Sequence, residues 1–202
     1  MVGLIVLALG LTLNTKTSLG ASAIISVPYT LSVIYHLDLG NTTLLMYFLF
    51  VIIQILLKKD SLIKTILQIP LSILFTRFMN LFKEVITYSS ENIYMNIVIC
   101  FIAVFFTALG IFLTVNADLV PNPGDGIVST IADCLDIELG RTKNIFDISC
   151  VIVSVLIGSL NRQPLIGVGI GTVISMLFVG RFLSVINWFA KTLIFKKNGL
   201  RV

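Results

Sequence analysis

Long apolar runs separated by short polar turns dominate this chain, and they predict membrane-spanning helices. A bilayer requires about 20 consecutive apolar residues for each spanning helix, and residues 5–195 contain several runs of this kind. Turn-forming residues lie between the runs, at 38–41, 58–61, 89–92 and 161–164. The pattern is typical of an all-α polytopic membrane protein.

An offset of one hundred residues aligns the two halves of the sequence over a long stretch without gaps. The matches include Ala-Leu-Gly at 8–10 and 108–110, Leu-Gly-x-Thr at 39–42 and 139–142, and, after a short insertion, Arg-Phe at 77–78 and 181–182. Because apolar helices match easily by chance, the shared glycine and threonine positions carry most of the weight. We therefore expect two homologous halves, 1–91 and 92–202, within one integrated bundle.

Each half divides into four segments, called a to d, of which segment b decides the topology. Segment a covers 2–13 and 93–113, segment b 18–37 and 121–137, segment c 43–57 and 144–160, and segment d 62–82 and 165–193. The second segment b contains Asp125, Asp133 and Asp136, and each carboxylate costs about 2.5–3.5 kcal/mol near the centre of a spanning helix. Segment b is therefore expected to be re-entrant or to line a polar cavity.

The distribution of basic residues favours the same topology. If segment b does not cross, each half has three spans and the halves are inverted relative to each other. One side then collects Lys58, Lys59, Lys64, Arg141, Lys143, Lys191, Lys196, Lys197 and Arg201, and the other side Lys16, Lys83 and Arg162. The first side has the excess of basic residues and includes the C-terminal cluster, so the C-terminus is expected to be cytoplasmic. The alternative has eight spans and parallel repeats.

Composition restricts the classes of function. The chain of 202 residues is 57% hydrophobic and only 12% charged, with a net charge of +4. It has one histidine, His36, and three scattered cysteines, Cys100, Cys134 and Cys150, which offer little for a metal site or a disulfide framework. No catalytic or nucleotide-binding motif is evident. We expect neither an enzyme nor a cofactor, and no nucleic-acid partner.

The most suggestive polar stretch is 118–126, which opens the second segment b. Asn122 is a good helix N-cap and Pro123 suits the first helical turn. Gly124 lets a ligand or a backbone come close, and free N–H groups at such an end favour an anionic or polar group. The substrate-binding candidates are Asn122, Pro123, Gly124 and Asp125, with Gly20 and Ser22 at the corresponding place in the first half. The alternative is an ordinary capped helix in a polar loop.

Asp147, inside the second segment c, is a further candidate for the site. An intramembrane acid is a functional hypothesis by default, and this one could relay protons or bind a cation. Alternatively it pairs with Arg141 or Lys143 one turn earlier. The other intramembrane polar residues are expected to bond between helices. The arginines are expected to reach the interface or, alternatively, to line a cavity for an anion. Together these residues are Asn14, Gln54, Gln68, Arg77, Asn80, Asn116 and Arg181.

Five stretches in this order resemble the YczE-like bacterial membrane proteins, which are relatives of the YitT group. They are 19–32, 67–72, 123–125, 143–147 and 167–172, and together they extend over nearly the whole chain. The family usually has proline where Ala23 stands and often glutamate where Asp125 stands. The resemblance implies a multi-pass protein of the bacterial cytoplasmic membrane, without a settled activity.

These observations favour a small-solute transporter or channel-like permease with its polar site where the segments b begin. Two alternatives are a non-transporting scaffold, accessory or sensor protein, and a substrate-binding membrane subunit of a larger importer. The expected partners are the lipid bilayer, a small polar or charged solute, and either further copies of the chain or a separate energising subunit.

Overall fold

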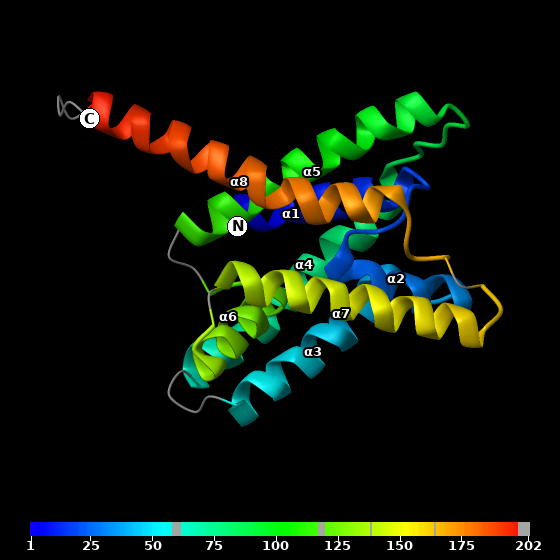
Figure 1. The fold of residues 1–202 in the computed structure, drawn as a ribbon, viewed down its shortest axis with the longest axis horizontal. Helices are drawn as coiled ribbons and strands as arrows, with labels where there is room; N and C mark the ends of the chain where they lie inside the picture. The colour runs from blue at the N-terminus through cyan, green and yellow to red at the C-terminus, as the bar shows by residue number, and fades with distance from the viewer. Residues whose placement is uncertain (58–61, 117–119, 138, 164, 198–202) are drawn as a thin grey trace.

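The computed structural model describes residues 1–57, 62–116, 120–137, 139–163 and 165–197, and the regular secondary structure in these ranges is entirely α-helical. In chain order the helices are α1 (Val2–Lys16), α2 (Ala23–Ile34), α3 (Leu39–Leu57), α4 (Leu62–Val85), α5 (Ile93–Asn116), α6 (Pro123–Leu135), α7 (Leu139–Leu160) and α8 (Ile170–Lys197) (Figure 1). The expected all-α architecture is confirmed.

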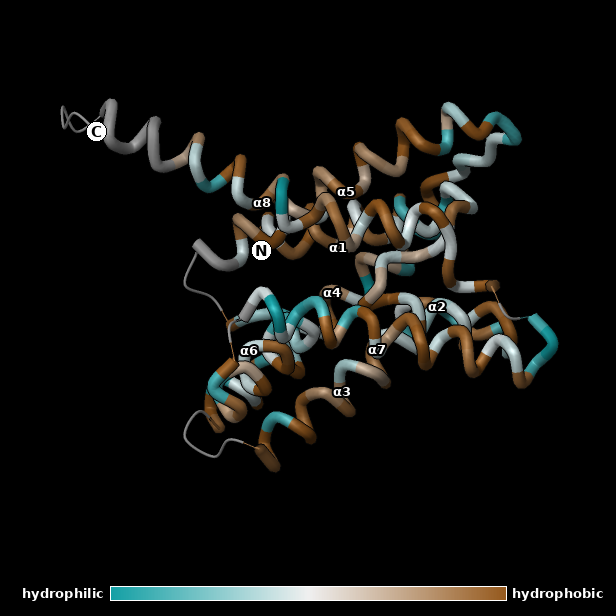
Figure 2. The backbone as a smooth tube through the Cα atoms, in the orientation of Figure 1, coloured by the Kyte–Doolittle hydropathy of each residue, from teal (hydrophilic) through white to brown (hydrophobic). Residues whose placement is uncertain are grey.

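Five of these helices, α3, α4, α5, α7 and α8, are long and apolar enough to cross a membrane. Large apolar side chains cover their outward faces, such as Ile63 and Leu160, which are 78% and 85% exposed. Water would not tolerate so much apolar surface, whereas lipid does. Figure 2 shows apolar residues along the helices and hydrophilic ones gathered at several of the turns. The chain is a multi-pass membrane protein.

Helices α2 and α6 are half-length. They contain 12 and 13 residues, and at a rise of about 1.5 Å per residue they reach about 18–20 Å, well short of a hydrocarbon core of about 30 Å. Helix α2 also begins later than segment b, because the preceding residues turn back, with Ser18 and Gly20 at φ 56° and φ 100°. These lengths fit the expected re-entrant segments and argue against eight spans.

Glycines bring α1 and α5 into close contact with each other. A Cβ on Gly10 would lie 2.5 Å from the backbone nitrogen of Thr107, and a Cβ on Gly110 would lie 2.5 Å from that of Leu7. Small residues of this kind let transmembrane helices approach closely and gain van der Waals contact. The crossing is therefore set by the two residues that lack a side chain.

Two helices pack on this pair, and the others pack mainly on one another. Helix α1 contacts α4, and α5 contacts α8. Helix α2 packs on α7 and α3, while α6 packs on α3 and α7. Smaller contacts join α2 to α8 and α6 to α4. Helix α3 also packs closely on α4, and α7 and α8 have no comparable contact.

The helix ends divide between two sides of the bundle. In Figure 1, α3 ends, α4 and α7 begin and α8 ends on the left, whereas α1, α4 and α7 end and α5 begins on the right. Lys16 and Lys83 lie in last turns at the right, and Arg141 lies in the first turn of α7 at the left. This division matches the expected separation of basic residues where the structure describes them. Lys58, Lys59 and Arg201 lie outside the described residues.

Candidate functional site

The first turn of α6 is built as its Asn-Pro start predicts. Asn122 is the N-cap, and its side-chain oxygen accepts a hydrogen bond from the Gly124 N–H at 3.3 Å. Its backbone carbonyl accepts from the N–H groups of Asp125 and Gly126 at 2.9 and 2.8 Å. Pro123 occupies the first helical position, where its missing N–H leaves no gap in the ladder. Asn122 is buried, so this helix start lies inside the bundle.

Two glutamines close the space behind this first turn. The Gln54 amide of α3 and the Gln68 amide of α4 donate to each other's oxygen atoms at 3.0 and 2.9 Å, and both side chains are buried. The Gln54 amide also reaches the Pro123 carbonyl at 3.5 Å. A Cβ on Gly126 would meet both amides at 2.7–2.8 Å. Helix α6 can rest on this pair because position 126 is a glycine.

Tyr47 of α3 completes the same face. Its ring is 2% exposed and stacks on Phe75 with centroids 5.9 Å apart. Its ring borders the first turn of α6, since a Cβ on Gly124 would lie 3.7 Å from Tyr47 Cε1, and its hydroxyl lies within electrostatic range of Asn122 and Asp125. Tyr47 therefore connects the aromatic core to the first turn of α6.

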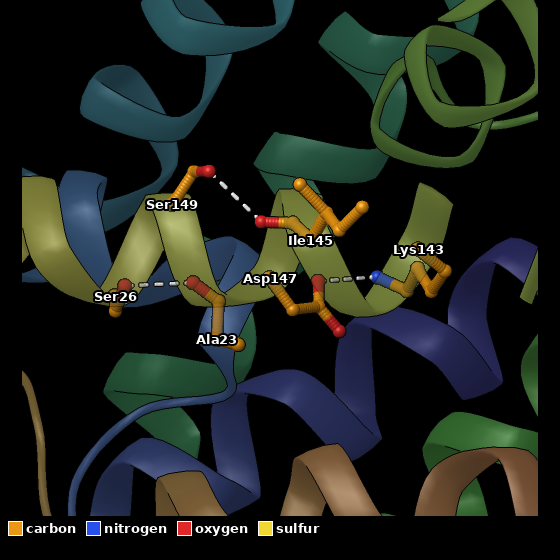
Figure 3. A network of polar contacts seen from close by, with 6 residues as sticks. All are labelled: Ala23, Ser26, Lys143, Ile145, Asp147 and Ser149. Atoms are coloured by element: carbon orange, nitrogen blue, oxygen red, sulfur yellow. Dashed lines mark hydrogen bonds and ion pairs between the residues drawn. The ribbon is translucent and has the colours of Figure 1, made fainter. Parts of the chain in front are cut away.

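Three charged residues adjoin the start of α6. Lys143 and Asp147 of α7, one turn apart, form an ion pair with Nζ 2.7 Å from Oδ1 (Figure 3). Asp147 is 7% exposed and Lys143 half-buried. Asp125 lies within electrostatic range of both, yet its carboxylate forms no hydrogen bond or ion pair within the part of the chain that the structure describes. We call Tyr47, Gln54, Gln68, Asn122, Asp125, Lys143 and Asp147 the α6 polar cluster.

The start of α2 meets the start of α6. A Cβ on Gly124 would lie 2.5 Å from Cδ1 of Ile24, so the Ile24 side chain fills the space that this glycine leaves. Ser22 is the N-cap of α2 and makes no side-chain capping bond. Figure 3 shows the first turn of α2, with Ala23 and Ser26, next to the Lys143–Asp147 pair. The two half-length helices therefore begin beside each other and beside the charged residues.

Gly20 lies in a different environment from the polar cluster. A Cβ there would meet the Gly169 nitrogen at 2.5 Å and the Thr172 hydroxyl at 2.6 Å. The adjoining backbone pairs with the segment before α8, since Gly171 N–H donates to the Leu19 carbonyl at 2.7 Å. Gly20 thus joins the loop before α2 to the start of α8.

A smaller polar contact holds α2 on α7. The hydroxyls of Thr30 and Ser154 lie 2.7 Å apart, and Ser154 also donates to the Ser26 carbonyl at 3.3 Å. Gly167 approaches this group so closely that a Cβ would overlap the Thr30 hydroxyl. The glycine-rich stretch before α8 therefore packs on a polar seam between α2 and α7.

The structure brings together most of the residues predicted for the site. Asn122, Pro123, Gly124 and Asp125 share one helix turn, and Asp147 lies within electrostatic range of Asp125. Asp118, which opens the predicted polar stretch, lies outside the described residues. Sequence reasoning missed Tyr47 and treated Gln54 and Gln68 as packing residues. It named the Lys143–Asp147 pair as an alternative from spacing alone, since residues four apart share a helix face.

The cluster is closed in this structure. A cavity of about 10 Å³ adjoins the start of α6, lined by Ser72, Phe75, Asn122 and Pro123 among others, which is about the smallest space that holds one water molecule. A larger hollow of about 370 Å³ lies on the surface beside His36, Asp38 and Asn41. Among the described residues, no group of three or more His, Cys, Asp and Glu side chains could hold a metal ion.

In a comparison with known proteins, a family profile matches residues 1–188. The chain belongs to the DUF6198 family. The function of DUF6198 is unknown, and no curated protein and no solved structure matches the chain. Membership in DUF6198 agrees with the expectation of an uncharacterised family. It does not support the YczE-like assignment, which stays a prediction.

Proposed function

We propose that this DUF6198 protein is a small-solute transporter or channel-like permease, and not an enzyme, whose polar site is the α6 polar cluster. The observation that carries the proposal is the meeting of α2 and α6, at Ile24 and Gly124, beside the buried Asp147 and the half-buried Lys143. Transporters often place their solute where broken helices begin near the membrane midplane. Buried charges inside a membrane protein are costly and usually functional.

We further infer that the two halves are inverted repeats. Under this relation, α1, α2, α3 and α4 of the first half correspond to α5, α6, α7 and α8 of the second half. The α2–α7 contact then corresponds to the α3–α6 contact, and the α1–α4 contact corresponds to the α5–α8 contact. In the same way, α2–α3 corresponds to α6–α7, and α2–α8 corresponds to α4–α6. The close packing of α3 on α4 is the exception. In Figure 1, α3 and α7 run in opposite directions, as inversion requires.

Details at the offset of one hundred residues support the duplication. The contact of Gly10 with Thr107 corresponds to the contact of Gly110 with Leu7. His36 and Asp136, which follow α2 and α6, are both left-handed, with φ 53° and 52°. Such left-handed backbone is uncommon outside glycine, so its recurrence at matched positions favours a common origin. Ile24 and Gly124, which touch, are also matched positions.

Transport would require the closed cluster to open. Ile24 fills the space over Gly124, and the adjoining cavity of about 10 Å³ is too small for an organic solute. A relative movement of the two repeats would separate the starts of α2 and α6 and expose Asp125. Such rocking of one repeat against the other is the usual form of alternating access.

Cysteine labelling tests this proposal directly. In a variant with Cys100, Cys134 and Cys150 replaced by serine, a single cysteine at Ser22 should react with membrane-impermeant thiol reagents from either face of sealed vesicles. A cysteine at Ser129, exposed on the same half-length helix as Asp125, is the control for reagent access. If Ser22→Cys stays unreactive from both faces while the control reacts, the transport proposal is wrong.

A non-transporting scaffold is the second candidate, and one observation favours it. The cluster is nearly void-free, and its two glutamines satisfy each other, as polar residues that serve only helix packing do. In this case purified protein in liposomes moves no solute. A substrate-binding subunit of a larger importer would also be silent alone, and would gain activity when the energising subunit is added.

We also propose that the protein lies in the cytoplasmic membrane of a bacterium with its C-terminus inside. The proposal rests on the resemblance to YczE-like proteins and on the side at which Arg141 and Lys143 lie, which is also where α8 ends (Figure 1). Basic residues accumulate on the cytoplasmic side.

A further inference from the structure

We propose that α8 closes onto α7 in a second conformation of this protein, as α4 lies on α3 in the present one, and that this movement covers the Lys143–Asp147 ion pair. The inference rests on the proposed inverted repeats, under which α7 and α8 correspond to α3 and α4. It deepens the proposed function, because it names the helix that controls access to one side of the α6 polar cluster.

Helices α3 and α4 touch each other at three levels along one face of α3. The pairs are Gly40–Asn80, Tyr47–Phe75 and Gln54–Gln68. In the first pair, the Gly40 N–H donates to the Asn80 side-chain oxygen at 2.7 Å. Positions 40, 47 and 54 are seven residues apart and therefore share one side of the helix. Helix α4 thus covers α3 over most of its length.

The corresponding positions of α7 and α8 do not meet in this way. An offset of 100 residues relates α3 to α7, and an offset of 104, which aligns Arg77 with Arg181, relates α4 to α8. The counterpart pairs are Gly140–Ser184, Asp147–Val179 and Ser154–Thr172. Ser154 bonds to Thr30 of α2 instead, and Asp147 bonds to Lys143 of its own helix. Within the described ranges, α7 and α8 have no contact comparable to that of α3 and α4.

Burial along α8 shows where the two helices separate. Thr172, near the start of α8, is 1% exposed, whereas a Cβ on Gly180 has nothing within 4 Å and Ser184 is exposed. On α4 the counterparts Gln68 and Thr76 are 3% and 2% exposed. Only 6% of the apolar span of α8 is buried, against 33% for α4. Helix α8 therefore diverges from α7 toward its own C-terminus, as Figure 1 shows.

The separated faces have the residues that a close helix contact requires. Gly140 is exposed on α7, and Gly180 and Ser184 lie four residues apart on α8. Small residues at this spacing are typical of contacts between transmembrane helices. A glycine inside an exposed helix destabilises it relative to alanine, and no contact of the present arrangement requires a glycine at 180. Closure would give it the place that Thr76 has against Gly40.

Closure would also bring α8 over the charged pair. Asp147 is the counterpart of Tyr47, which α4 covers through Phe75. Lys143 is half-buried in the present structure and would lose its remaining exposure beneath α8. Movement of one repeat against the other is how inverted repeats alternate access to a central site. The closing helix would therefore block access to this pair from the side where α7 begins and α8 ends (Figure 1).

Disulfide formation in a variant without the native cysteines tests the closure. Gly140→Cys and Ser184→Cys can be bridged only when their Cα atoms come within about 7 Å of each other. We expect copper phenanthroline to link them within one chain in native membranes. The matched control combines Gly140→Cys with Phe182→Cys, which lies at the same level of α8 but packs on Phe105 of α5. The control pair should not link.

A bulky residue at position 180 should obstruct the closure. Gly180→Phe should slow formation of the 140–184 disulfide by about ten-fold, equivalent to about 1.4 kcal/mol, because the ring enters the face that meets α7. It should leave the thermal unfolding midpoint unchanged, since the position is open in the present conformation. Val185→Phe, at an exposed position on another side of α8, should leave the rate unchanged. Equal rates in the two variants would overturn closure in the manner of α3 and α4.

Two further results would overturn the proposal. One is the absence of a link although both thiols react with a monofunctional reagent. The other is a link that forms only between chains, in a mixture of the two single-cysteine variants, which would show that a second copy covers this face of α8.

The closure and the transport proposal fail separately. A 140–184 link within a chain that moves no solute in liposomes would retain the closure and overturn transport. Solute movement by a chain in which this pair never links would retain transport and overturn the closure.

Discussion

Single residues without side chains control how closely polar groups approach in this protein. Gly126 lets the first turn of α6 rest on the hydrogen-bonded amides of Gln54 and Gln68. Gly167 does the same for the hydroxyls of Thr30 and Ser154. In each case the glycine allows a buried polar pair to remain satisfied, which matters because an unpaired buried polar group costs about 1–3 kcal/mol.

Gly126→Ala should destabilise the protein by about 1–3 kcal/mol, because the new methyl group displaces both glutamine amides and weakens their mutual hydrogen bonds. The free energy of unfolding in mixed micelles measures the effect. Gly180→Ala on α8 is the control, since a Cβ there has nothing within 4 Å. It should stabilise its helix by up to about 1 kcal/mol. Equal effects of the two substitutions would show that the amide pair does not restrain α6.

The residues at the start of α6 and around it differ in how well the sequence predicts their contacts. The Lys143–Asp147 pair follows from a four-residue spacing on one helix. Asn122 and Pro123 follow from local capping preferences. Tyr47 carries no local signal for its place beside the first turn of α6, because it belongs to α3 and reaches this turn only when α3 packs on α6.

The helices themselves follow largely from apolar periodicity, but their lengths do not. Segment b of the first half was expected over 18–37, whereas α2 covers only Ala23–Ile34. The difference arises from the loop before α2, which pairs its backbone with the segment before α8 through Ala21 and Gly167, and through Leu19 and Gly171. Such long-range pairing leaves no trace in local composition.

The crossing of α1 and α5 is the contact between helices most sensitive to substitution. Gly10→Val places a branched side chain where the Thr107 nitrogen and the Ala103 carbonyl already lie 2.5 and 2.8 Å away. Because backbone atoms cannot rotate aside, the helices must separate. We expect a loss of about 3 kcal/mol, at the upper end of the usual range for one substitution. Denaturant titration in micelles measures it.

The control for this crossing is Gly180→Val, which adds the same side chain at an open position. It should cost less than about 1 kcal/mol, the scale of helix propensity differences. If Gly10→Val is as mild as this control, the close approach of α1 and α5 does not contribute to stability.

At the scale of the whole molecule, the inverted arrangement predicts the face of the membrane at which each connection between helices lies. Single cysteines at Leu62 and Arg141 should react from one face of sealed, oriented vesicles, and cysteines at Glu91 and Arg162 only from the other face. All four positions are exposed in the structure. Impermeant thiol labelling of a variant lacking the native cysteines provides the measurement. With eight spans and parallel repeats, positions 62 and 141 would instead label from opposite faces.

The sequence alone determined that the chain belongs in a membrane, because a composition with 57% hydrophobic and 12% charged residues cannot cover a soluble surface. It also located the capped start of α6, and it left Arg141 and Lys143 as the two possible partners of Asp147, since these contacts depend on nearby residues. Only the tertiary structure decided that α2 and α6 begin against each other at Ile24 and Gly124, and that this junction is closed. Those features depend on how distant helices rotate and pack, which local preferences do not specify.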